Sequence, residues 1–197
     1  MLTGLLPELT FAYLLVFARV GAILMVLPGF GETYISPRVR LVIALALSIV
    51  VQPVVSQGML GMPNAPVDLL PLLGGEILIG IFIGGAIRLL VAALHVAGIV
   101  ISFQSSLGFA QFFDPAQGAQ GALLGSFLTL MGMTMIFMSD LHHLMLMAVV
   151  DSYELFPVAG GPPVDDFALM ATQAVANSFF VGIQISAPFI AYALLLY

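Results

Sequence analysis

Apolar blocks that are too long for a simple membrane helix place the tightest limit on how this chain can fold. Connections rich in proline, glycine and acidic residues separate five such blocks, at about 9–27, 39–55, 69–109, 119–150 and 167–197. A helix rises about 1.5 Å per residue, and about 20 residues cross the hydrocarbon core of a bilayer. As single helices the third block would extend for about 60 Å and the fourth for about 50 Å. We therefore expect these blocks either to be broken and kinked or to pack against other protein subunits instead of lipid.

The composition is that of a helical membrane protein. Of the 197 residues, 61% are hydrophobic and 7% are charged, whereas soluble domains carry about 25% charged residues. Four arginines, no lysine and a net charge of −6 leave no basic surface for nucleic acid. The chain has no cysteine, which excludes disulfides and thiolate metal sites. We predict one all-α domain over residues 1–197.

Both ends of the sequence are apolar. The N-terminus lacks the basic start of a signal peptide and stays apolar as far as Pro28, so we expect a retained first helix. The last residues, "AYALLLY", lie inside an apolar run without a polar tail. We expect that a C-terminal segment is missing from this sequence.

The basic and acidic residues of the loops indicate an orientation in the membrane. Arg38 and Arg40 lie in the only basic loop, whereas the loop after Val150 carries acidic residues. The excess of arginine in cytoplasmic loops places the first loop in the cytoplasm and the N-terminus outside.

Glycine spacing indicates close helix packing. Gly80 and Gly84 form one GxxxG pattern, and Gly121 and Gly125 form another. Such a pattern lets two helix backbones approach closely in a membrane, although the pattern alone is common in membrane helices. Each pattern therefore indicates either a true helix contact or a coincidence of spacing.

Arg19, Glu76, Arg88 and His95 are ionisable side chains that lie inside the apolar blocks. A charge in such a position tends to face a partner, a cavity or a polar boundary. Pairing of Arg19 with Glu76 is one solution. Such a pair would either hold two helices together as a structural ion pair or act as a relay for protons or ions. We favour the structural ion pair.

A methionine-rich stretch offers a second candidate site. Met131, Met135, Met138 and Met145 recur at helical spacing, within about 80° of one face of a continuous helix. Core packing explains such a stripe. The alternative is an adaptable seal, because thioether side chains conform to irregular partners.

Asp140, His142 and His143 suggest a metal site or proton shuttle, but their spacing differs from the i, i+4 histidine pair of zinc helices. We favour a structural hydrogen bond between Asp140 and His143. The chain lacks GxSxG, HExxH, P-loop and GxGxxG motifs. We predict neither an enzyme nor a bound cofactor or metal, and keep an intramembrane metalloenzyme as the weakest alternative.

The segment "SFQSSLGFAQFFDPAQGAQG" interrupts the apolar blocks with polar residues, aromatics and glycines. Asp114 and Pro115 favour a helix break. Phe109, Phe112 and Phe113 would form one aromatic patch on a helical turn, with Gly108 as a possible hinge. Such a patch is able to close a narrow path by excluding water. Alternatively, the aromatic side chains bury themselves against neighbouring helices.

Five stretches in order resemble the FliR family of flagellar export-gate proteins and its relatives in virulence type III secretion. They are "ARVGAILMVLPGFGETYISPRVRLVIALAL", "GGEILIGIFIGGAIRLL", "VAGIVISFQSSLGFAQFFDPAQGAQGALLGSF", "HHLMLMAVVDSYELFP" and "ISAPFIAYALLL". The chain departs from the family at Leu141, where a glycine is frequent, and in lacking the closing segment with its arginine and Pro-Gln-Leu-Asn.

The resemblance implies a subunit of a protein-export channel in the bacterial inner membrane, within the flagellar basal body. It implies membrane-associated helical hairpins with long, bent helices, packed with FliP-like, FliQ-like and FlhB-like subunits and partly raised toward the periplasm. Unfolded exported proteins would be the substrate. Membrane lipid would contact the helix surface that the other subunits leave uncovered. It also implies a plug loop at about 108–118. The main alternative is a small-solute or ion transporter that uses the four ionisable residues as its pathway.

Overall fold

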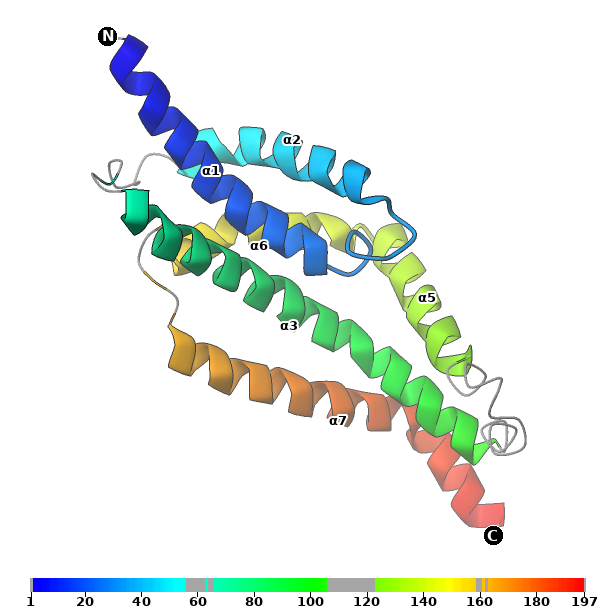
Figure 1. Ribbon diagram of the computed structural model, residues 1–197. Coiled ribbons are helices and arrows are strands. Elements are labelled where there is room, and N and C mark those ends of the chain that lie inside the picture. The colour runs from blue at the N-terminus through cyan, green and yellow to red at the C-terminus, as the bar shows by residue number, and fades with distance from the viewer. Residues whose placement is uncertain are drawn as a thin grey trace, which may run out of the picture. The chain divides into compact units, whose positions relative to one another are not determined.

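The computed structural model describes residues 2–55, 63, 66–105, 123–158, 161 and 163–196, with side chains from Pro7 onward. Every regular element in these ranges is helical, which confirms the predicted fold class. Figure 1 labels the α-helices: α1 (Leu2–Val26), α2 (Pro37–Val55), α3 (Leu69–Gln104), α5 (Leu123–Met138), α6 (Leu141–Leu155) and α7 (Val164–Leu196). A short 3-10 helix, η2 (Pro66–Asp68), directly precedes α3.

Four helices in the described ranges are long and apolar enough to cross a membrane. They are Pro7–Val26, Pro37–Val55, Leu69–Gln104 and Val164–Leu196. The helices α5 and α6 together meet the same test as one interrupted span. The helices of the structure therefore agree with the membrane protein that the composition predicts.

The two long apolar blocks in the middle of the sequence form different structures. The third contains one unbroken helix, α3, of 36 residues. The fourth is broken at Ser139 and Asp140, between α5 and α6. Asp140 adopts a left-handed backbone conformation, with φ at 58°, which aspartate tolerates better than most residues. Its N–H donates to the carbonyl of Phe137 at 3.4 Å. A short polar pair thus ends one apolar helix and starts the next.

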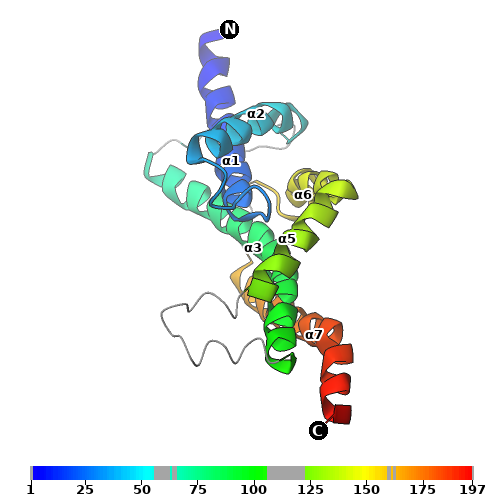
Figure 2. The ribbon, with the colours of Figure 1, turned by 90° about the vertical axis from the view of Figure 1, so that its right-hand side faces the viewer.

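The chain divides into two compact units, and each is described separately. The first contains Met1–Ile87 and His142–Ala168, and the second contains Arg88–Leu141 and Leu169–Tyr197. In the first unit α1 and α2 lie side by side (Figure 2). The core of this unit is apolar and lies between α1, α2 and α6; its buried members are Val16, Val20, Ile23, Leu24, Leu27, Ala44, Val51, Val149 and Tyr153.

The connection between α1 and α2 is a compact turn. Gly29 has φ at 89°, a conformation that favours glycine. Pro37 opens α2, and its fixed φ suits that position. The N–H of Val39 donates to Oγ of Ser36 at 3.4 Å, so Ser36 caps the helix. Arg40 returns to the turn, where its Nη2 donates to backbone carbonyls.

In the second unit, α3 meets both α5 and α7 at glycines. A Cβ atom on Gly98 would lie 2.4 Å from Cα of Gly125, so the backbones of α3 and α5 touch there. A Cβ atom on Gly182 of α7 would lie 3.0 Å from the carbonyl oxygen of Ala93. Because no side chain fits between these backbones, glycine sets the helix spacing.

Candidate functional site

A buried ion pair joins α1 to α3 in the first unit. Nε of Arg19 donates to Oε2 of Glu76 at 2.6 Å, and the two side chains are 0% and 2% exposed. The desolvation of each charge is costly, and the attraction between them offsets it only with good geometry and further hydrogen bonds. The ion pair between Arg19 and Glu76 that the sequence suggested is therefore present, and it is buried from solvent.

Two residues of α6 complete the surroundings of Arg19. Its Nη1 donates to the carbonyl oxygen of Ser152 at 3.1 Å and to Oγ of Ser152 at 3.4 Å. The ring of Tyr153 lies 4.0 Å from Cζ of Arg19, a cation–π contact. Among the described residues, Nη2 of Arg19 has no hydrogen-bond partner. Arg19 thus connects α1, α3 and α6.

Glycines allow α3 to come close enough to α1 for this pair to form. A Cβ atom on Gly80 would lie 2.7 Å from both Cβ of Ala22 and the carbonyl oxygen of Arg19. One on Gly84 would lie 2.9 Å from the carbonyl oxygen of Ile23. A true helix contact is therefore present at this GxxxG pattern. In the second pattern, Gly125 makes a close contact and Gly121 lies outside the described residues.

Arg88 and His95, which also lie inside the apolar blocks, belong to the second unit. Arg88 is exposed near the middle of α3. His95 is half-buried and covers Gly125 of α5, where a Cβ atom would lie 2.7 Å from its Nδ1. His95 therefore contributes to helix packing in this unit.

The methionine stripe does not run along one helix, because the chain breaks at Ser139 and Asp140. Met131, Met135 and Met138 are exposed on α5. Met145, on α6, packs against the buried cluster of the first unit. The proposed seal is thereby reduced to three residues on one helix.

The structure says little about two further candidate sites from the sequence, the plug segment and the histidine pair. The plug residues Gly108, Phe109, Phe112, Phe113, Asp114 and Pro115 lie outside the described residues. His142 and His143 lie in the first turn of α6, with their ring centroids 4.1 Å apart. The metal hypothesis at these histidines stays untested.

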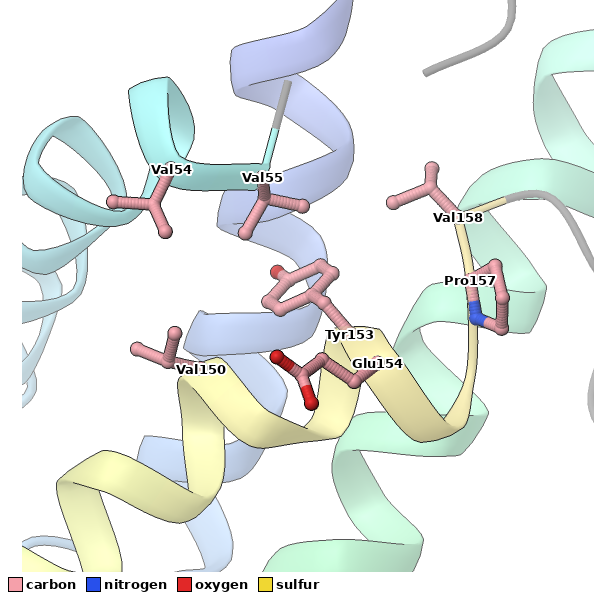
Figure 3. Close-up of a pocket in the computed structure, with 7 residues that line it drawn as sticks. All are labelled: Val54, Val55, Val150, Tyr153, Glu154, Pro157 and Val158. Carbon is pink, nitrogen blue, oxygen red and sulfur yellow. The ribbon is translucent and has the colours of Figure 1, made fainter. Parts of the chain in front are cut away.

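A pocket that sequence reasoning missed lies between the end of α2 and the end of α6. It has a volume of about 240 Å³, and Figure 3 shows its lining residues: Val54, Val55, Val150, Tyr153, Glu154, Pro157 and Val158. Apart from Tyr153 and Glu154, the lining residues are valines and a proline. The only sequence signal was an acidic residue at the end of an otherwise apolar helix.

Comparisons with known proteins agree on one family. The model of "Bacterial export proteins, family 1" matches residues 10–197. The chain is 41% identical over 184 residues to the flagellar biosynthetic protein FliR of Caulobacter vibrioides, covering 91% of this chain and 72% of that protein. It is 28% identical over 185 residues to the FliR protein of Bacillus subtilis, covering 91% and 70%. With the FliR protein of Escherichia coli it shares 27% identity over 178 residues, covering 90% and 67%.

Proposed function

Because this chain belongs to the bacterial export proteins, family 1, and is a subunit of the flagellar export apparatus, we propose that it forms part of the wall of the protein-conducting channel. Its apolar helices fit a location in the bacterial inner membrane. In this role the chain contributes shape and packing, and it has no enzymatic activity of its own.

The length and exposure of α3 carry this proposal. Its 36 residues extend for about 54 Å, whereas the hydrocarbon core of a bilayer is about 30 Å thick. Only 22% of its most apolar window is buried within the chain, and for α7, with 33 residues, the figure is 11%. Lipid is too thin to cover helices of this length, so other protein subunits cover the remainder.

FliP-like, FliQ-like and FlhB-like subunits are the proposed partners, and an unfolded exported protein is the proposed substrate. An assembly of this kind explains why so much apolar surface extends beyond a single bilayer thickness. Part of the assembly would then be raised toward the periplasm. Energy for export would come from other components of the apparatus.

The plug is a separate part of the proposal. Segment 108–118, with Phe109, Phe112 and Phe113, would close the channel at rest and yield to a translocating chain. The exposed methionines of α5 would line an adaptable contact beside the moving substrate or a neighbouring subunit. Deletion of 108–118, or alanine at the three phenylalanines, should make membranes that contain the whole apparatus leaky to ions. Unchanged permeability in an assembled complex would count against the plug.

Burial of the Arg19–Glu76 pair disfavours the transporter alternative. Both side chains are almost fully buried, and Arg19 is also held by Ser152. A relay needs access for the transported ion, whereas this pair is packed as a structural link.

Affinity purification in mild detergent, followed by mass spectrometry, tests the proposed function. A channel subunit should retain several other export proteins in fixed ratio and should be unstable without them. A transporter should purify alone as a stable protein that moves a solute across vesicle membranes.

A further inference from the structure

The pocket between α2 and α6 combines an apolar wall with one carboxylate. Val54 and Val55, at the end of α2, face Val150 and Tyr153 of α6 (Figure 3). Glu154 follows on the same helix, and its carboxylate lies at the pocket. Such a site suits a ligand with an apolar stem and a cationic end.

The Glu154 carboxylate has no basic partner in its own unit. The side chain is exposed, and within the described ranges no hydrogen bond or ion pair engages it. The neighbouring positive charge of Arg19 is already neutralised by Glu76 at 2.6 Å. The pocket is therefore left with a net negative charge.

The sequence itself offers no suitable base to fill the pocket. It contains no lysine, and of its four arginines Arg19 and Arg40 are engaged in their own contacts. Arg38, at the start of α2, lies about 24 Å along the helix from Val54. The remaining arginine, Arg88, belongs to the second unit. No lysine or arginine side chain in the described part of this unit is placed to meet Glu154, so a complementary charge would come from another molecule.

We infer that this pocket receives a lysine or arginine side chain from a partner subunit of the export apparatus. The volume of about 240 Å³ is below the range of about 300–1,000 Å³ that is typical of small-molecule sites, and it suits one long side chain. The aliphatic stem would lie along the valines while the charged end meets Glu154. This inference rests on the proposed function, because it needs a partner subunit.

Charge reversal at the pocket tests the inference in the full chain, purified with its partners in mild detergent. Glu154→Lys should lower the amount of co-purified partner subunits about tenfold, because a buried partner charge would lose its counterion. Val54→Trp, which fills the pocket from an exposed position, should have the same effect. Asp165→Lys is the matched control: Asp165 is an exposed acid of the same unit that does not line the pocket. It should change recovery by less than about twofold.

A cross-link identifies the occupant directly. Because the chain has no cysteine, Val54→Cys, at an exposed position that lines the pocket, provides a unique thiol for a thiol-directed photo-crosslinker and leaves the Glu154 carboxylate in place. The expected product is a covalent adduct with another polypeptide at a peptide that contains lysine or arginine. Adducts with lipid alone, or with no polypeptide, would overturn the inference.

The outcomes separate this inference from the proposed function. If the unaltered chain retains its partners but Glu154→Lys and Asp165→Lys behave alike, the pocket is not the contact. If the unaltered chain retains no partner at all, the proposed function fails, and the pocket proposal fails with it. Equal membrane abundance of all variants would establish that changes in recovery reflect assembly and not folding.

Discussion

Arg19 of α1 and Glu76 of α3 meet across 2.6 Å although 57 positions separate them in the chain. Ser152 and Tyr153 of α6 close the same site. The charge pair therefore fixes the relative position of three helices in the first unit. Single replacements here should affect folding and assembly together.

Removal of one member of this pair should be far more damaging than removal of both. Arg19→Met or Glu76→Leu alone leaves an uncompensated buried charge and should lower the free energy of unfolding by about 3–5 kcal/mol. The double variant should recover most of that loss, because apolar side chains of similar volume replace both charges. Thermal unfolding in detergent measures the difference, with Glu8→Gln at an exposed position as control. A double variant as unstable as the worse single one would show that the charges themselves are needed.

Two glycines of α3 should respond in opposite ways to alanine. Gly80→Ala places a Cβ atom 2.7 Å from the backbone oxygen of Arg19 and should destabilise the unit by about 1–3 kcal/mol. Gly85 has open space around the same position, so Gly85→Ala should stabilise the helix by up to about 1 kcal/mol. The free energy of unfolding of each variant is the measurement. Equal effects would mean that α1 and α3 are not in contact at Gly80.

Arg40 should hold the turn between α1 and α2, whereas Arg38 should not. Nη2 of Arg40 donates to the carbonyl oxygens of Glu32 at 2.6 Å and Ile35 at 2.9 Å. Arg40→Ala should speed hydrogen exchange of the amides at 31–36 by about tenfold or more, since these bonds are worth more than about 1.4 kcal/mol together. Arg38→Ala, at an exposed position of the same helix, should leave that exchange unchanged. Similar exchange in both variants would remove this role from Arg40.

Two phenylalanines of α7 should separate folding from assembly. Phe167 is buried and stacks on Phe82 with ring centroids 3.9 Å apart, so Phe167→Ala should lower stability by about 3–5 kcal/mol. Phe179 is 54% exposed. Its replacement by alanine should leave the fold of the chain intact while reducing the recovery of partner subunits. Normal recovery for Phe179→Ala would place this part of α7 away from any subunit contact.

The sequence predicted the elements set by local pattern better than those set by distant contacts. Apolar length indicated an all-helical membrane protein, and the GxxxG spacing indicated the contact at Gly80 and Gly84. Arg19 and Glu76 were paired because each charge needed a partner. A break in the fourth block was one of the two alternatives, but its position at Ser139 and Asp140 was not predicted, since it depends on two polar residues within an otherwise continuous apolar run.

Contacts without a motif were beyond prediction. Ser152 and Tyr153 reach Arg19 only because α6 packs on α1, more than 130 positions away in the chain. Gly98 and Gly182 are isolated glycines whose close approaches follow from packing in the second unit. The pocket at Glu154 likewise exists only once α2 and α6 are placed together.

The most direct measurement of the central claim is site-specific photo-crosslinking from Phe180, which is 61% exposed on α7. The account predicts that, in membranes of flagellated cells, this position forms covalent adducts with other export subunits. Adducts only with lipid, from a chain that is stable on its own, would contradict the assignment of this surface to a multi-subunit channel.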